Sequence, residues 1–91
     1  MDKDFTIAIT ATHIALANEP SLDNCPIGFA LIEAYPEVDW LVSEDDAIGF
    51  QRDEAETEIE YLLDAVGRSF VRNYDLCRPV KPCTVAFRVV S

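Results

Sequence analysis

Residues 24–36 of this chain read NCPIGFALIEAYP, and they predict the helix around which the other elements pack. Asn24 is a favourable N-cap because its side-chain oxygen accepts an unpaired amide of the first turn. Pro26 suits that turn, where its missing N–H is not needed, and Pro36 ends the helix. Apolar residues recur at the i, i+3, i+4, i+7 spacing of one helix face: Ile27, Ala30, Leu31 and Ala34. Glu33 is the only charge, so we expect a buried helix.

The sequence before this helix predicts a strand and a second, shorter helix. Phe5, Ile7 and Ile9 alternate with small or polar residues, which is typical of a half-buried strand. Thr10 or Thr12 is expected to cap a short helix over residues 13–18. Pro20 and Ser21 mark residues 19–23 as a loop.

The sequence after residue 36 predicts strands over residues 40–43, 47–52 and 83–90, with Ile48 and Phe50 on one side of the second. Residues 57–61 fit either a strand or the start of a helix, and we favour a strand. A helix is expected over residues 63–75, with an apolar stripe at steps of four residues: Leu62, Val66, Phe70 and Tyr74. Gly67 is expected to weaken that helix by about 1 kcal/mol relative to alanine.

Two prolines make residues 76–82 a connector to the last strand. The whole chain, residues 1–91, is expected to form a single domain with the order β-α-α-β-β-(β)-α-β. This order predicts a two-layer α+β fold in which two main helices lie on one face of an antiparallel sheet. With the short pieces set aside, it is the order of a ferredoxin-like, split βαβ fold.

Charge is distributed unevenly along this acidic chain. Seventeen acids and seven bases give a net charge of −10, and residues 37–64 alone carry eleven acids against Arg52. Residues 65–91 carry Asp75 against five bases, a net of +4. This balance disfavours direct binding to nucleic acid or to an anionic membrane, because both would repel the chain. A basic protein surface is the partner that the charge favours.

The acidic hairpin region is the main candidate for a binding site. Eight carboxylates are predicted to contact a partner: Glu44, Asp45, Asp46, Asp53, Glu54, Glu56, Glu58 and Glu60. In a strand, Glu56, Glu58 and Glu60 share one face at a spacing of roughly 6.6 Å. Such a row resembles the regular phosphates of a nucleic acid. Trp40 and Tyr35 are expected to cap the core, and Trp40 or Tyr35 becomes a candidate anchor of the interface if it is exposed. The alternative is a solubilising face that blunts an edge strand.

The cysteines and the histidine allow two further readings, and we assign neither. Cys25 lies at a helix N-terminus, where the dipole favours the thiolate, and His13 could pair with it as a nucleophilic dyad. Cys25, Cys77, Cys83 and His13 could also bind zinc, although their spacing differs from that of structural zinc sites. An odd number of cysteines favours reduced thiols. We therefore predict no catalytic residues, no metal ligands, no cofactor and no enzymatic activity.

Three short motifs carry a resemblance to small acidic bacteriophage proteins. They are Thr12-His13-Ile14-Ala15, then Asn24-Cys25-Pro26-Ile27 with Ala30-Leu31, and Val80-Lys81-Pro82 before the last strand. The resemblance implies an inhibitor of host defence, such as an anti-CRISPR protein, or a DNA mimic that blocks a host DNA enzyme. It carries no catalytic residues with it.

The expected function is therefore a non-enzymatic inhibitor, monomeric or homodimeric, that acts in the host cytoplasm. Its acidic hairpin would block a basic nucleic-acid-binding surface of a host protein. The alternative is a structural or assembly protein that associates with itself through a sheet edge or an apolar patch. No apolar run approaches the roughly 20 residues of a membrane span.

Overall fold

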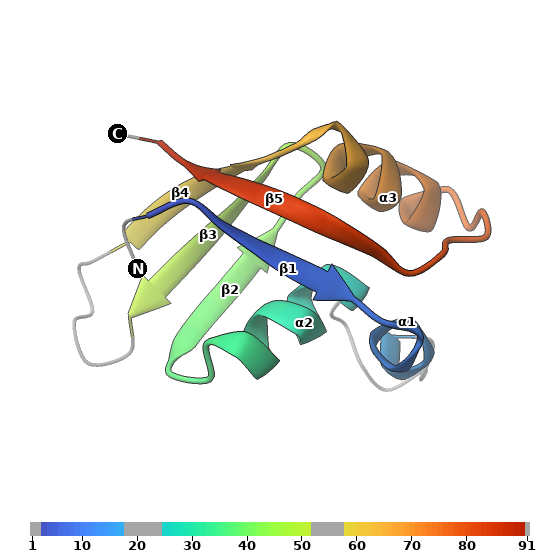
Figure 1. The fold of residues 1–91 in the computed structure, drawn as a ribbon, viewed down its shortest axis with the longest axis horizontal. Helices are drawn as coiled ribbons and strands as arrows, with labels where there is room; N and C mark the ends of the chain where they lie inside the picture. Colours follow the sequence, from blue (N-terminus) through green and yellow to red (C-terminus); the bar gives the residue numbers. More distant parts are fainter. Residues whose placement is uncertain (1–2, 18–24, 52–57, 91) are drawn as a thin grey trace.

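The computed structural model describes residues 3–17, 25–51 and 58–90, and these form one antiparallel sheet with three helices (Figure 1). In chain order the elements are β1 (Phe5–Ile9), α1 (Ala11–Ala17), α2 (Pro26–Ala34), β2 (Val38–Val42), β3 (Asp46–Gln51), β4 (Glu58–Leu63), α3 (Ala65–Asp75) and β5 (Cys83–Val89). The strand order is β1-β5-β4-β3-β2. The predicted strand at residues 57–61 is confirmed as β4, whereas the loop at residues 19–23 and the acidic turn at residues 53–56 lie outside the described residues.

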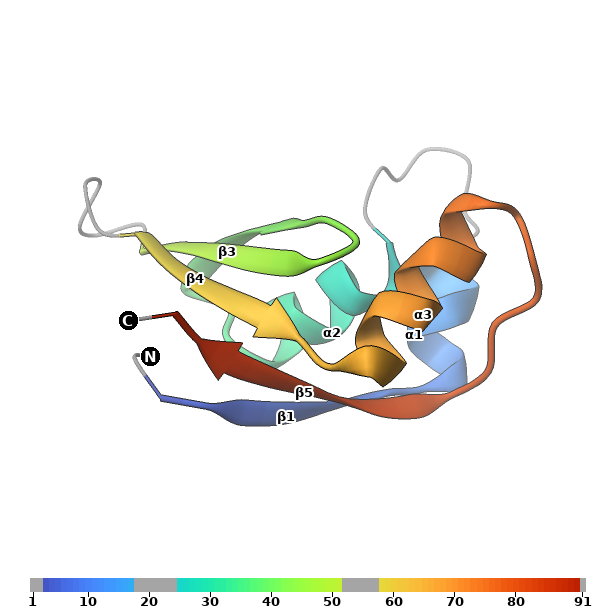
Figure 2. The ribbon, with the colours of Figure 1, turned by 90° about the horizontal axis from the view of Figure 1, so that it is seen from above.

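The sheet curls around α2. This helix packs against β1 and against β2, which are the two edge strands. Figure 2 shows α2 between the β3 and β1 sides of the sheet. Ile27 and Leu31 of α2 are fully buried in the core, and each such side chain contributes roughly 1.5–3 kcal/mol of hydrophobic stabilisation. The face of the sheet toward α2 is therefore concave and apolar, and the opposite face is convex.

Strand register assigns each side chain to one of these two faces, because directly paired residues of antiparallel strands point to the same side. The concave face carries the buried residues Ile9, Val38, Ala47, Tyr61, Leu63, Val85 and Phe87. The predicted inward side of the last strand, with Val85 and Phe87, is confirmed.

The predicted central helix is confirmed over residues 26–34, with differences at both ends. The N-cap position is Cys25, which makes no side-chain capping hydrogen bond, and Pro26 is the first helical residue. The proposed cap Asn24 lies outside the described residues. Ala34, expected on the buried stripe, is exposed, because Tyr35 already leaves the helical conformation and the last turn faces solvent.

The predicted stripe on the second main helix is confirmed at Phe70, which is buried, and is wrong at Val66. Val66 is 48% exposed, and the buried residues of α3 are Gly67, Phe70 and Val71. The reason is that α3 begins at residue 65 after Asp64, whose carboxylate accepts a hydrogen bond from the Gly67 N–H at 2.8 Å. Leu62 is still in β4 and does not set the phase of the helix.

Gly67 allows α3 to lie close to β5. A Cβ atom at this position would lie 2.5 Å from Cγ1 of Val85 and 3.1 Å from Cβ of Leu63. Val85 is fully buried, and its β-branched side chain has little rotamer freedom to yield. The glycine that weakens the isolated helix is therefore required by the packing of the folded chain.

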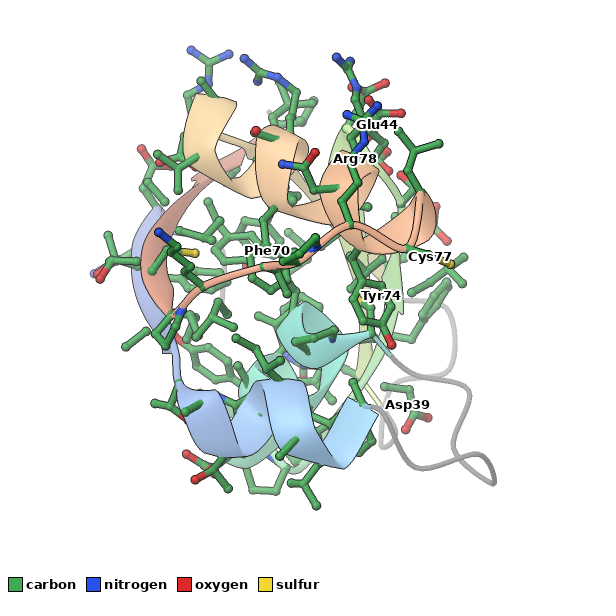
Figure 3. The ribbon with its side chains drawn as sticks, turned by 90° about the vertical axis from the view of Figure 1, so that its right-hand side faces the viewer. Asp39, Glu44, Phe70, Tyr74, Cys77 and Arg78 are labelled. Carbon is green, nitrogen blue, oxygen red and sulfur yellow. The ribbon has the colours of Figure 1, made fainter. Side chains whose placement is uncertain are left out.

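The helix α3 ends at a residue that has a left-handed backbone conformation although it is not glycine. Cys77 has a φ of 59°. Its N–H donates to the Tyr74 carbonyl at 3.0 Å and the Arg78 N–H donates to the Asn73 carbonyl at 2.8 Å, which is the Schellman arrangement. The Tyr74 hydroxyl donates to the Ala17 carbonyl at 3.0 Å, so the end of α3 is also tied to α1 (Figure 3).

The α+β class with one antiparallel sheet is confirmed, but the ferredoxin-like order is not. A split βαβ unit joins two parallel strands through a helix and places a third strand between them, whereas β4 and β5, which flank α3, are direct antiparallel neighbours, and β1 and β2 are the two edges of the sheet. The single face with two main helices is not confirmed either. The helix α2 bridges the two edge strands, whereas α3 packs against β5 and β4.

We predict that Gly67→Ala destabilises the fold by about 1–3 kcal/mol, because overpacking against Val85 outweighs the better helix propensity of alanine. Urea unfolding followed by circular dichroism measures the change. Ser69→Ala, on the exposed side of the same helix, should stay within about 0.5 kcal/mol of the parent. A Gly67→Ala variant as stable as the parent would contradict the close packing.

We predict that Cys77→Gly stabilises the fold by about 0.5–1 kcal/mol, because glycine adopts positive φ without the steric penalty of a Cβ atom. Cys77→Ala keeps that penalty while removing the thiol, and it should leave the free energy of unfolding unchanged. Equal effects of the two substitutions in urea unfolding would assign the change to the thiol instead of the backbone.

Candidate protein-binding face

The convex side of β2, β3, β4 and the end of β5 gathers acidic and apolar side chains that none of the described helices covers. We call it the outer face, and it consists of Asp39, Leu41, Asp46, Ile48, Phe50, Glu58, Glu60, Leu62, Arg88 and Val90. Cross-strand pairs place Ile48 between Leu41 and Glu60, and Phe50 between Asp39 and Glu58. The outer face is therefore an array over β2, β3, β4 and the end of β5 in which apolar side chains lie beside carboxylates.

The apolar part of the outer face is well exposed. Leu41 is 61% exposed and Val90 is 43% exposed. Ile48, Phe50 and Leu62 are half-buried. Scattered apolar surface is common in folded proteins, but several such residues side by side on one face are typical of interaction sites.

The acidic part includes a directly coupled carboxyl pair. The side chains of Asp46 and Glu60 hydrogen-bond to each other, and the Ser43 hydroxyl also donates to Asp46. These contacts hold the pKa of Asp46 below its usual value, first through Ser43 and then through Glu60. The neighbouring Asp46 raises the pKa of Glu60. The pair therefore shares a proton more readily than two isolated carboxyl groups do.

The structure brings together only part of the predicted acidic site. Asp46, Glu58 and Glu60 lie on the outer face, so the predicted row is confirmed for the two glutamates. Glu44 lies at the β2–β3 turn and accepts a hydrogen bond from Nε of Arg72 at 2.7 Å, so this carboxylate is neutralised by α3. Figure 3 shows Glu44 far from Asp39.

The other predicted carboxylates lie elsewhere. Asp45 lines a surface hollow together with Arg68 of α3 and with Leu62 and Arg88 at the border of the outer face. Asp53, Glu54 and Glu56 lie outside the described residues. Of the predicted carboxylates within residues 3–17, 25–51 and 58–90, three lie on strands, Asp46, Glu58 and Glu60, and two lie at the β2–β3 turn, Glu44 and Asp45.

Trp40, the predicted anchor, points to the concave side. Its ring lies over Gly49, where a Cβ atom would approach it to 3.1 Å. It also contacts the rings of Phe5, Tyr35 and Tyr61, with centroids 6.0–6.3 Å apart. Trp40 thus completes an aromatic cluster of the core and lies on the face opposite to the carboxylates.

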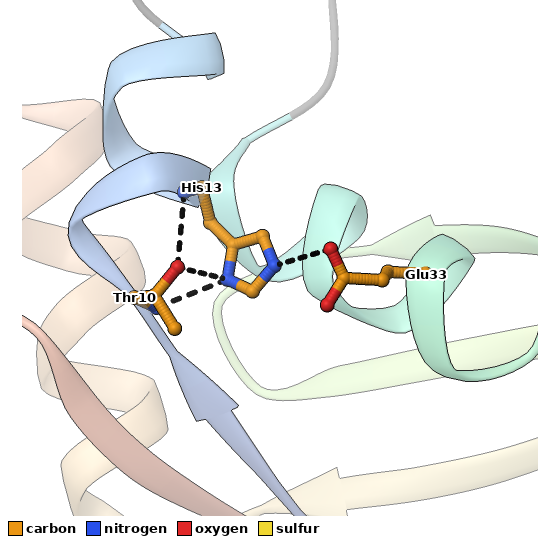
Figure 4. A network of polar contacts seen from close by, with 3 residues as sticks. All are labelled: Thr10, His13 and Glu33. Atoms are coloured by element: carbon orange, nitrogen blue, oxygen red, sulfur yellow. Dashed lines mark hydrogen bonds and ion pairs between the residues drawn. The ribbon is translucent and has the colours of Figure 1, made fainter.

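His13 joins the β1–α1 corner to α2 (Figure 4). The Thr10 N–H donates to Nδ1 of His13 at 3.0 Å, so the ring proton is on Nε2, which contacts Oε2 of Glu33 at 3.3 Å. The Thr10 hydroxyl accepts from the His13 N–H at 3.3 Å and so caps α1, which confirms the first of the two predicted caps. Both ring nitrogens are engaged in a structural contact.

Cys25 does not have the lowered thiol pKa that a position at a helix N-terminus could have given it. Burial raises the pKa of its thiol, outweighing the Gly28 and Ile27 amides at the start of α2 that lower it. Neither the dyad with His13 nor the four-residue zinc site is assembled. Among the described residues no group of three or more His, Cys, Asp or Glu side chains is placed to hold a metal ion.

Sequence reasoning missed the apolar half of the outer face and one of its acids. Asp39 and Leu41 alternate with Val38, Trp40 and Val42 in β2, and this alternation signals two faces. The sequence placed Ile48 and Phe50 on one side of β3, which is confirmed, but it did not show that this side is the outer one.

Comparison of the chain with protein-family models, curated proteins and solved structures finds no match. No helix within the described part of the chain is long and apolar enough to cross a membrane.

We predict that Glu60 takes up a proton at a higher pH than an ordinary glutamate, because ionised Asp46 lies beside it. Carboxyl-carbon NMR shifts recorded against pH measure this. As the pH falls through the raised pKa of Glu60, the outer face loses one negative charge and the repulsion within the pair is relieved, while Asp46 stays ionised to lower pH. In Asp46→Asn the Glu60 midpoint should move down, and a midpoint that does not move would contradict the coupling.

Proposed function

We propose that this chain is a non-enzymatic binding protein whose outer face docks on a basic, nucleic-acid-binding surface of a host protein and blocks it. The observation that carries the proposal is the arrangement of Asp39, Asp46, Glu58 and Glu60 around an exposed apolar centre. In line with the resemblance to bacteriophage proteins, the proposed context is inhibition of a host defence or DNA enzyme, including the anti-CRISPR class.

Electrostatics supports a basic partner. Four carboxylates and the single cation Arg88 lie on the outer face as the structure describes it. The net charge of −10 adds a long-range attraction for a basic protein and a repulsion for nucleic acid. Arginine side chains of a partner would meet these carboxylates bidentately. Association should be fast and sensitive to salt.

The apolar centre supports a protein partner. Specific protein interfaces combine a desolvated apolar centre with a polar rim. Leu41 is the most exposed large apolar residue described in this chain, and it lies directly beside Ile48.

The same centre also favours a second candidate function, a structural protein that associates with itself. Exposed Leu41 and Val90 are the observation for it. In a symmetric dimer through this face, however, the carboxylates of the two copies would face one another, which opposes association at neutral pH. Sizing at two protein concentrations and two salt concentrations separates the candidates, since a salt-insensitive dimer would favour self-association.

We predict that Glu58→Lys/Glu60→Lys weakens capture of basic proteins from a bacterial lysate at low salt by at least about 10-fold, because two attractive contacts become repulsive. The immobilised variant and parent are compared by elution with rising salt. Both glutamates are exposed, so the fold should be kept, and unfolding in urea checks this.

The matched control is Glu37→Lys/Asp75→Lys, which changes the net charge equally but at exposed positions outside the outer face. It should capture the same proteins as the parent. Equal losses in the two double variants would show attraction to net charge alone, and the outer face would then not be the site. Parent capture that does not respond to salt would contradict the proposal as well.

A further inference from the structure

The shape of the outer face restricts the kind of basic surface that it fits. Because α2 contacts both edge strands, the sheet is bent around it and the outer face is convex. A convex face makes extensive contact only with a concave surface. The partner site is therefore a groove.

The composition of the outer face restricts the groove further. Its centre consists of Leu41, Ile48 and Phe50, which lie side by side on β2 and β3. Covering an exposed leucine stabilises a complex by roughly 1–2 kcal/mol, whereas an exposed ion pair contributes about 0–1 kcal/mol. The floor of the groove must accordingly be apolar or aromatic, and the basic residues must stand on its walls, opposite Glu58, Glu60 and Asp39.

Surfaces that bind a duplex and grooves that bind a single strand differ in whether they have an apolar floor. Surfaces that bind a duplex make half to two-thirds of their hydrogen bonds to phosphates and sugars, and they are polar and strongly positive. Grooves that bind a single strand combine basic walls with aromatic side chains on which the bases stack. Only the second kind offers an apolar floor between cations.

We infer, on the basis of the proposed function, that the outer face imitates a single-stranded nucleic acid and occupies a basic groove with an aromatic floor. Glu58, Glu60, Asp46 and Asp39 take the place of the phosphates. Leu41, Ile48, Phe50 and Val90 take the place of the stacked bases.

The test separates proteins by the nucleic acid that they bind. A bacterial extract freed of nucleic acid is passed over immobilised oligo(dT) and, separately, over immobilised duplex DNA. Each retained pool is offered at low salt to the immobilised parent chain. We expect capture from the oligo(dT) pool, and release of the captured proteins by an excess of free oligo(dT).

Two double variants test the apolar centre. Leu41→Ser/Val90→Ser removes two exposed apolar side chains from the outer face, and it should weaken capture by at least about 10-fold with no change in its dependence on salt. Leu16→Ser/Val66→Ser removes the same two residue types from exposed positions on α1 and α3, and capture should be unchanged. All four positions are at least 42% exposed, so both variants are expected to fold.

The outcomes distinguish this inference from the proposed function. Capture from the duplex pool alone, capture that free oligo(dT) does not reverse, or full capture by Leu41→Ser/Val90→Ser overturns the single-strand inference and leaves the proposed function in place. Absence of capture from both pools overturns both. A dimer that is stable at high salt and is lost in Leu41→Ser/Val90→Ser would replace both with self-association.

Discussion

The contact of α2 with both edge strands is the constraint on which the rest of this structure depends. An almost entirely apolar helix must be buried on most of its surface, and one flat sheet covers only one side of a helix. By curling until β1 and β2 both reach α2, the sheet surrounds Ile27 and Leu31 and removes them from water. The same curvature brings the two open edges of the sheet against protein, which limits pairing with other chains.

The curvature also determines what the second face of the sheet can do. The helix α2 packs on the concave side against β1 and β2, and α3 packs against β5 and β4. On the convex side of β2, Leu41 is 61% exposed to solvent. An exposed Leu41 beside half-buried Ile48 and Phe50 is informative because these side chains are not needed for the core. Under the proposed function, the acids beside them would select a cationic partner and the apolar side chains would add affinity.

The arginines of α3 divide the acidic region into two parts. Arg72 neutralises Glu44 at the β2–β3 turn, whereas Glu58 and Glu60 lie further along β4 on the outer face. A protein that imitated nucleic acid by charge alone would expose carboxylates at its turns as well as on its strands. The observed division concentrates negative charge next to the apolar centre, and the coupled pair of Asp46 and Glu60 makes that charge dependent on pH.

The sequence alone determined which segments are helices and strands, because periods of 3.6 and 2 are local properties of residues such as those at 26–34 and 83–89. It identified Gly67 as a weakness but not as the contact with Val85, and on α3 it placed Phe70 correctly in the core but Val66 wrongly. A period of two shows that β3 has two faces but not which one is buried. Only the tertiary structure decided which face of β3 is buried. Strand order and curvature arise from contacts between residues far apart in the chain, and those contacts place Ile48 and Phe50 on the outer face beside the carboxylates.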